Sequence, residues 1–410
     1  MTTARRSAAS PAQVCMTLSA IAATGAVRRP SGETRQEHEQ RIVRGITAQL
    51  ADPDLATGGT WELVWLALTP DNGNLAYIAS DSARPDTLAV AVRGTVASNP
   101  IDLLEDFQVG RTELFDSGGS PRWVEVSKGA KDAFDLIVKQ PGTQPGGTSP
   151  GVTLAQMLDD LTGPKASSTV HVTGHSLGGC VATMVGPYLQ RLKWQRKPRF
   201  SLVTFAAPTA GLRDFADAVE SLPWGLQERH VNAYDLIPLA WADITAAESW
   251  YPAPGPAARP EDKVILEAIS KSTNGHVYVQ PGAPLVVNSG YSTFDPQKVE
   301  DFTGQVAFQH ANPTYLSLLG APLTLPGPTV ESLAPASGSA GTTVVISGSG
   351  FTGDSGVDFG RVAAPPSDVV VESSNRISVT APPGSGDAQV RVTNMIGTSP
   401  AVPGSVFSYG

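Results

Sequence analysis

The chain has 410 residues, and its 29 Lys and Arg against 38 Asp and Glu give a formal net charge of −9. This acidic balance, with no basic stripe, argues against nucleic-acid binding, because phosphate is neutralised by clustered basic side chains. No apolar run approaches the length of a membrane-spanning helix, and an apolar fraction of 41% is too high for disorder. We therefore expect a soluble globular protein of two domains, without a transmembrane segment.

The N-terminal segment fits two interpretations. Two arginines precede the mildly apolar stretch 14–26, a pattern typical of a secretory or twin-arginine signal. Ser10 and Pro11 instead match an N-cap followed by Pro at the first helical position. The apolar residues that follow share one helical face: Val14, Leu18, Ile21 and Ala22. We favour the structural helix, because helix-start chemistry accounts for more of the residues.

The next elements predict an α/β domain. A capping-box pattern at Thr34 and Glu37 begins a helix over 34–51. Strands are expected at 61–68, 77–80 and 87–92. After a Pro- and Gly-rich loop, helices (154–161, from 177, 212–222) alternate with strands (169–173, 201–205, 230–234). Such alternation predicts a mostly parallel sheet flanked by helices, with ligand chemistry at the carboxyl ends of its strands.

The character of the sequence changes beyond residue 325. Gly and Pro clusters there separate short alternating runs at 343–347, 369–372, 377–380 and 388–393, without helical periodicity. This pattern is typical of a small all-β sandwich. We therefore divide the chain into an α/β domain over 1–325, which includes the N-terminal helices, and a sandwich over 326–410.

A candidate nucleophile lies at Ser176, in the Gly-His-Ser-Leu-Gly-Gly motif of residues 174–179. The motif follows an expected strand and precedes an expected helix. A serine on such a strand-turn-helix elbow projects from the backbone and can attack a carbonyl. Small residues are needed beside it because the strained turn crowds both neighbouring segments. The alternative is a glycine-rich helix start with an idle serine.

In hydrolases of the elbow type, the acid and the histidine follow the serine in the chain. Two histidines that follow Ser176 are candidates for the base, His276 and His310. We favour His310, because it lies in an expected loop whereas His276 begins an expected hairpin strand. Asp235 directly follows the strand 230–234 and is the favoured carboxylate. The alternatives are Asp214, Asp217 and Asp243, of which the first two suit a solvated helix face.

The developing oxyanion requires two donors. One is the backbone N–H of Leu177, next to the nucleophile, and the other should come from the loop after an earlier strand. Thr95 closes the strand 87–92 and can offer its N–H and its hydroxyl, although an ordinary strand-end turn explains this position equally well.

Five blocks occur together in one order: Arg93-Gly94-Thr95, the motif at 174–179, Thr204-Phe205-Ala206-Ala207-Pro208, Asp235 before Pro238, and His310 ahead of Asn312-Pro313-Thr314-Tyr315. In these blocks the chain resembles a class 3 lipase over roughly residues 60–320. The order of the blocks is more specific than any one of them. The resemblance implies an α/β-hydrolase fold and the hydrolysis of carboxylic esters, often acylglycerols.

Carried over residue by residue, the resemblance implies Ser176 as nucleophile, with Asp235 and His310 as its triad partners. It also implies Thr95 and Leu177 as oxyanion donors, with no cofactor and no metal. One departure is Ala206, where relatives often have Gly. This departure leaves the conformation of the local turn open.

In such enzymes the segment after the oxyanion turn often forms a lid. Ile101, Leu104 and Phe107 share one helical face within residues 100–107, which fits a mobile flap and a plain surface helix equally well. We expect Ile101, Leu104 and His175 to contact the substrate. The choice between long acyl chains at an interface and short soluble esters depends on this segment.

Nearly all of residues 327–410 resembles an immunoglobulin-like IPT/TIG domain. The residues that carry this resemblance are Thr329–Ala334 with Pro335, the segments 341–348 and 357–360 with Gly350-Phe351, and the closing Phe407-Ser408-Tyr409. The resemblance implies a docking or attachment role. Modules of this type favour a secreted or cell-surface location, which the N-terminus does not support.

Two other functions stay open at this point. A non-catalytic binding protein would use the sandwich as its working part and the hydrolase fold as a scaffold. An amidase or transacylase would use the same triad, because the shape of the pocket decides among substrates of one nucleophile.

Overall fold

The structure is a computed structural model that describes residues 8–25, 34–71, 73–93, 108–142, 151–242, 251, 256–288, 302–323, 328–351, 355–373, 375–394, 397–399 and 401–410. The chain folds into two compact units. The first comprises Met1–Ala22 and Pro53–Pro322, and the second comprises Ala23–Asp52 and Leu323–Gly410. The domain boundary expected between residues 325 and 326 stays a prediction.

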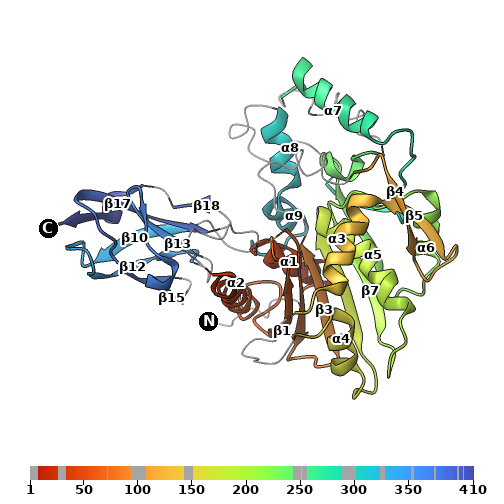
Figure 1. Ribbon diagram of the computed structural model, residues 1–410, viewed down its shortest axis with the longest axis horizontal. Coiled ribbons are helices and arrows are strands. Elements are labelled where there is room, and N and C mark those ends of the chain that lie inside the picture. The colour runs from red at the N-terminus through yellow and green to blue at the C-terminus, as the bar shows by residue number, and fades with distance from the viewer. Residues whose placement is uncertain are drawn as a thin grey trace, which may run out of the picture. The chain divides into compact units, whose positions relative to one another are not determined.

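In the described part of the first unit, a seven-stranded sheet has the order β1-β2-β3-β6-β7-β8-β9 (Figure 1). Its strands are β1 (Trp61–Leu68), β2 (Leu75–Asp81), β3 (Thr87–Arg93), β6 (Thr169–His175), β7 (Arg199–Phe205), β8 (Gln227–Asn232) and β9 (Pro284–Asn288). Neighbours from β1 to β3 are antiparallel, and neighbours from β3 to β9 are parallel. The predicted mostly parallel sheet is confirmed.

The register of the parallel strands brings their carboxyl ends to one edge of the sheet. Gly174 of β6 is paired with Val92 of β3 on one side and with Thr204 of β7 on the other. Phe205 is paired with His230 of β8. Side chains that directly follow β6, β7 and β8 are therefore gathered at this edge, which is where open α/β sheets bind their ligands.

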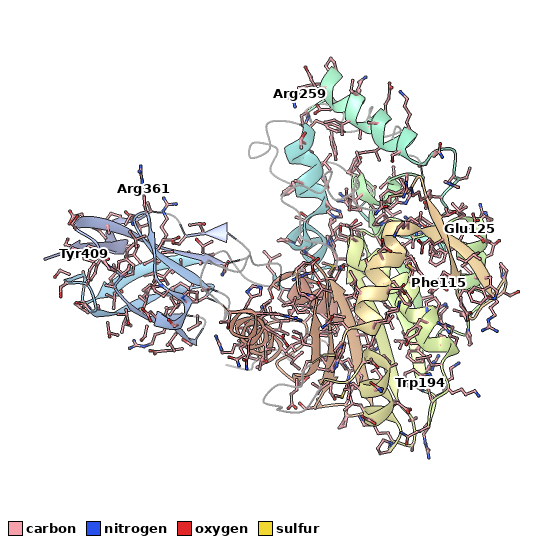
Figure 2. All side chains as sticks on the ribbon, viewed as in Figure 1. Phe115, Glu125, Trp194, Arg259, Arg361 and Tyr409 are labelled. Carbon is pink, nitrogen blue, oxygen red and sulfur yellow. The ribbon has the colours of Figure 1, made fainter. Side chains whose placement is uncertain are left out.

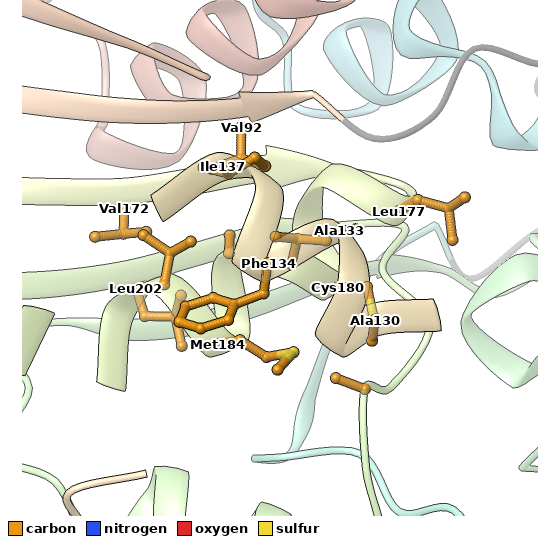
Figure 3. Close-up of a cluster of buried hydrophobic side chains, with 14 of the residues drawn as sticks. Val92, Ala130, Ala133, Phe134, Ile137, Val172, Leu177, Cys180, Met184 and Leu202 are labelled. Atoms are coloured by element: carbon orange, nitrogen blue, oxygen red, sulfur yellow. The ribbon is translucent and has the colours of Figure 1, made fainter. Parts of the chain in front are cut away.

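Helices cover one face of the sheet through a large apolar cluster. They include α3 (Lys128–Lys139), α4 (Leu154–Thr162), α5 (Leu177–Arg191) and α6 (Arg213–Glu220). Figure 3 shows Phe134 of α3 between Met184 of α5 and the strand residues Val172 and Leu202. These side chains are buried, so the helix that begins beside Ser176 is fixed to the sheet by packing.

The opposite face of the sheet is covered by α1 (Pro11–Ala23) and α9 (Asn312–Leu318). Alternate residues of β7 point to opposite faces, so Leu202 lies in the first cluster whereas Phe205 packs with Met16 of α1 and Leu316 of α9. The predicted N-terminal helix is confirmed. At its start, the Ser10 hydroxyl accepts the Gln13 N–H at 3.2 Å.

Several elements of the first unit differ from the sequence-based expectation. A hairpin of β4 (Thr112–Asp116) and β5 (Trp123–Ser127) was not expected. The strand β9 and four helices were also not expected, namely α3, α9, α7 (Pro260–Ser272) and α8 (Phe302–His310). Arg259 precedes the first turn of α7 (Figure 2). His310 is the last residue of α8, so its expected place in a loop was wrong.

Two smaller expectations were also wrong. The hairpin strand expected from His276 does not form, because Tyr278 makes only an isolated bridge to Leu212. The strand expected at 230–234 is β8, which ends at Asn232, so Asp235 follows it after two further residues.

The second unit contains α2 (Arg35–Leu50) and an all-β sandwich. One sheet has the order β10-β12-β16-β15, and the other has the path β11-β19-β17-β13-β14 with β18 beside β17. The strands are β10 (Thr329–Ala334), β11 (Ser337–Gly338), β12 (Thr343–Ser349), β13 (Gly356–Phe359), β14 (Val362–Ala363), β15 (Val369–Ser373), β16 (Arg376–Thr380), β17 (Gly386–Asn394), β18 (Gly397–Thr398) and β19 (Val406–Tyr409). The predicted sandwich is confirmed.

The sandwich has a core of its own. Buried apolar residues from both sheets form one cluster, in which Val344, Ile346 and Ile377 come from one sheet and Val390 and Phe407 from the other. Within the described ranges of the whole chain, no helix is long and apolar enough to span a membrane.

Candidate active site

Ser176 occupies the turn between β6, which ends at His175, and α5, which begins at Leu177. Its backbone has φ 59° and ψ −134°, a conformation that is costly for any residue except glycine. Two hydrogen bonds hold this turn: the Ser176 N–H donates to the Phe205 carbonyl oxygen at 2.9 Å, and the Ser176 carbonyl oxygen accepts the Cys180 N–H at 3.1 Å. The strand-turn-helix elbow expected from the motif is present.

Glycines around the turn allow its segments to approach closely. A Cβ atom at Gly174 would lie 2.3 Å from the Gly178 carbonyl carbon, and one at Gly179 would lie 2.7 Å from the Ala207 Cβ. Both distances are impossible contacts, so any larger residue would push β6 and α5 apart. The motif therefore needs glycine at these positions for steric reasons.

His310 lies within hydrogen-bond distance of Ser176. Its Nε2 atom is 2.8 Å from Ser176 Oγ, and its Nδ1 atom is 2.9 Å from Asp235 Oδ2 and 3.1 Å from Oδ1. Since a carboxylate only accepts hydrogen bonds, Nδ1 carries the imidazole proton and Nε2 is free to accept the Ser176 proton. The structure thus brings Ser176, His310 and Asp235 together in the expected order.

Asp235 is fully enclosed by donors. Its side chain is 1% exposed, and Oδ1 accepts the Ile237 N–H at 3.0 Å. The Tyr315 hydroxyl donates to Oδ2 at 2.8 Å and accepts the Asn232 N–H at 2.9 Å. Burial and the nearby Asp235 charge raise the pKa of Tyr315 well above its usual value, so this hydroxyl keeps its proton.

Tyr315 belongs to the last block of the resemblance, where no role was predicted for it. Its five-residue distance from His310 gave no signal of a contact with Asp235, which lies 80 residues earlier in the chain. The two alternative acids that are described do not reach His310. Asp214 accepts the Glu125 N–H at 2.9 Å, and Asp217 is exposed on α6. Asp243 lies outside the described residues.

His175 packs beside the catalytic candidates. Its ring centroid lies 4.7 Å from that of His310 and 5.4 Å from that of Tyr315. Burial, reinforced by the charge that His310 can carry, holds the pKa of His175 well below its usual value, while a hydrogen bond to the His310 backbone acts in the opposite direction. The expected substrate contact of His175 stays a prediction, and the expected contacts Ile101 and Leu104 lie outside the described residues.

The residue expected to be one oxyanion donor, Leu177, lies at the start of α5. Leu177 is the first residue of the helix, and the first N–H groups of a helix have no intrahelical acceptor. The helix dipole also favours negative charge at this end. The second expected donor, Thr95, lies outside the described residues, as does the whole segment 100–107.

Ala206 lies in the turn that follows β7, whose conformation the sequence left open. It has φ 54°, the left-handed region that glycine adopts readily, and it is completely buried. Its N–H donates to the His230 carbonyl oxygen at 3.1 Å. The open question about this turn is thereby answered: the alanine takes the backbone conformation that favours glycine.

Comparisons with known proteins agree with the two resemblances. Residues 89–243 match the family model described as lipase (class 3), and residues 328–409 match that of the IPT/TIG domain. No curated protein matches the chain. The crystal structure of M37 lipase has a TM-score of 0.63 at 22% identity, covering 76% of this chain and 92% of that one, which shows a shared fold.

Two further solved structures are less similar. Lip2 lipase from Yarrowia lipolytica has a TM-score of 0.38 at 18% identity and covers 55% of this chain and 72% of that one. Lipase II from Rhizopus niveus has a TM-score of 0.35 at 20% identity, with coverages of 51% and 76%. These TM-scores are too low to carry an argument.

Proposed function

We propose that the chain is a carboxylic ester hydrolase that works through Ser176, His310 and Asp235, because residues 89–243 match the class 3 lipase family model and residues 328–409 match that of the IPT/TIG domain. One observation carries this proposal: a continuous hydrogen-bonded relay runs from Ser176 Oγ through both imidazole nitrogens of His310 to a buried carboxylate. A serine hydroxyl is a weak nucleophile until such a base lies beside it.

Acylation begins when Ser176 Oγ attacks the ester carbonyl carbon and gives its proton to His310 Nε2. The resulting imidazolium is stabilised by Asp235, whose two oxygens face Nδ1. The carbonyl electron pair moves onto oxygen, where the Leu177 N–H and, by our expectation, Thr95 donate hydrogen bonds to the oxyanion. When the oxyanion collapses, the C–O bond of the ester breaks and His310 protonates the departing alcohol.

Deacylation repeats these steps with water as the nucleophile. His310 removes a proton from the water, which attacks the acyl carbon, and Ser176 leaves as the alcohol after regaining its proton. The acid product is then released and the enzyme is restored. No redox change and no metal is required at any step.

The substrate we propose is a fatty acyl ester, such as an acylglycerol, because this is the chemistry that the family name describes. Initial rates on p-nitrophenyl esters of increasing acyl length test this choice. Rising kcat/KM toward long chains, with a further increase above the solubility limit of the ester, is the expected result. A steady fall beyond short acyl groups would instead identify a soluble esterase.

The hydrolase itself is tested by Ser176→Ala together with labelling by an organophosphate. We expect the variant to lose nearly all turnover and all labelling, leaving only about 10³-fold acceleration over water. A matched control is Ser270→Ala, which changes an exposed serine on α7. Near-normal ester hydrolysis by Ser176→Ala would overturn the proposal, and an unlabelled wild-type protein would favour a binding function.

A further inference from the structure

His175 lies at a junction between two parts of the candidate active site. It is the last residue of β6, directly before Ser176, and its ring approaches those of His310 and Tyr315 with interplanar angles of 41° and 77°. One neighbour is the base that receives the Ser176 proton. The other is the tyrosine that donates to Asp235.

The ring of His175 contacts His310 in two ways, by ring packing and by a hydrogen bond to the His310 backbone. Its Nε2 atom is buried and has no hydrogen-bond partner among the described residues. Burial disfavours the charged form, so the ring stays neutral at ordinary pH. Neutrality matters here because a second positive charge against His310 would weaken that residue as a base.

We propose that His175 is a positioning residue: its neutral ring supports one side of His310 and keeps Nε2 directed at Ser176 and Nδ1 at Asp235. This inference rests on the proposed function and adds a residue to it. The Asp235 contact fixes only one edge of the His310 ring, and His310 is the last residue of α8, two residues before α9 begins. Packing of the His175 ring against the His310 ring, together with the hydrogen bond of His175 to the His310 backbone, supplies a second restraint.

The proposal gives His175 a role that differs measurably from a substrate contact. A residue that binds the ground state and the transition state equally affects KM, whereas a misplaced base lowers kcat. A small fluorophosphonate reacts with Ser176 without needing an acyl-chain pocket. Its rate of phosphonylation therefore measures how well His310 activates Ser176. This rate should therefore follow kcat if His175 positions His310.

The test compares His175→Ala, His175→Phe and His171→Ala in the full chain, using p-nitrophenyl butyrate and the fluorophosphonate. His171 is a matched control because it lies on the same strand and the same face of the sheet, four residues before His175, and is also largely buried. Thermal unfolding of each variant shows how much of any loss comes from stability.

We expect His175→Ala to lower kcat and the phosphonylation rate together by about 10²-fold, the cost of a catalytic group displaced by about 1 Å, with little change in KM. His175→Phe restores a neutral ring but not the hydrogen bond to the His310 backbone, so it should regain part of the loss. His171→Ala should leave both rates near those of the wild type, even where it lowers the unfolding temperature.

Three results would overturn the inference. They are an unchanged kcat in a folded His175→Ala variant, a change confined to KM, and equal losses in His175→Ala and His175→Phe. The failure of the proposed function looks different, because the wild type itself would then neither hydrolyse the ester nor react with the fluorophosphonate.

Discussion

The Tyr315 hydroxyl links the carboxylate of Asp235 to the backbone of β8, since it donates to Oδ2 at 2.8 Å while accepting the Asn232 N–H at 2.9 Å. Tyr315→Phe removes both hydrogen bonds: the buried Asn232 N–H loses its partner, and Asp235 Oδ2 keeps only its contact with His310 Nδ1. We expect the free energy of unfolding to fall by about 1–3 kcal/mol and kcat to fall as well, because Asp235 loses a restraint. Urea unfolding and ester turnover measure the two effects.

Tyr77→Phe is the matched control for Tyr315→Phe. The Tyr77 hydroxyl is also fully buried, and it donates to the Leu18 carbonyl oxygen at 2.7 Å, far from the relay in sequence. This variant should lose stability but keep its kcat. Equal kcat in both variants would show that Tyr315 serves the fold alone.

Stability should depend on pH through the buried histidines. Burial lowers the pKa of His171 and His175 from the usual 6.5, so below that pH the unfolded chain binds protons that the folded chain does not. The free energy of unfolding therefore falls as the pH drops from about 7 to about 5, by up to about 1.4 kcal/mol per pH unit for each imidazole. Asp71 and Asp116, with pKa values lowered from 3.8, act only at more acidic pH.

Urea titrations at several pH values across this window measure the effect in the wild type and in His175→Phe. The variant cannot bind the proton in either state, so its stability should change less with pH. A flat profile in the wild type, or an identical slope in His175→Phe, would contradict the prediction.

The parallel sheet and the elbow were predictable because their signals are local. Each buried strand is a short apolar run, and the glycines of the motif surround Ser176 within a few residues. Chain order, added to these signals, favoured Asp235 and His310, although the loop expected around His310 is the end of α8. The contact between Tyr315 and Asp235 left no such signal, because it joins segments 80 residues apart through tertiary packing.

Two of the missed elements, β4 and α7, lack clean hydrophobic periodicity. In β4, Phe115 is buried but its neighbour Leu114 is 63% exposed, so the strand does not show apolar alternation. In α7, Val264 is 68% exposed whereas Asp262 is buried by its contacts with Arg259, which inverts the usual amphipathic pattern. Tertiary context decided these segments, and a single sequence does not contain that information.

Ala206→Gly should change stability very little. The left-handed backbone of Ala206 costs about 1–2 kcal/mol, which glycine would relieve. Glycine would also lose the burial of one methyl group, about 0.8 kcal/mol, and add about 0.4–1 kcal/mol of unfolded-state entropy. These opposing terms nearly cancel, which explains why alanine is tolerated in a backbone conformation that favours glycine.

Gly58→Ala isolates the backbone part of this balance. Gly58 has φ +63°, and a Cβ atom there would meet nothing within 4 Å, so no burial term enters. We expect the free energy of unfolding lost in Gly58→Ala to exceed the free energy gained in Ala206→Gly by about 0.8 kcal/mol. A loss or gain above about 2 kcal/mol in Ala206→Gly would show that the turn rearranges.

The N-terminal helix α1 should contribute to the stability of β6, the strand that directly precedes Ser176. The Ser19 hydroxyl of α1 lies 3.0 Å from that of Thr173, three residues before the nucleophile, and both groups are buried. Ser19 also donates to the Cys15 carbonyl oxygen at 2.9 Å, so its hydroxyl oxygen can accept a hydrogen bond from the Thr173 hydroxyl. We expect Thr173→Val, which preserves shape, to lower the free energy of unfolding by about 1 kcal/mol.

A double-mutant cycle with Ser19→Ala measures how directly the two hydroxyls interact. Residues in one hydrogen-bond network show coupling of about 0.5–3 kcal/mol, whereas independent sites add within about 0.5 kcal/mol. Ser10→Ala provides a control, because it removes the N-cap of the same helix without touching Thr173 and should be additive with Thr173→Val. Additive effects of Ser19→Ala and Thr173→Val would mean that α1 supports β6 through apolar packing alone.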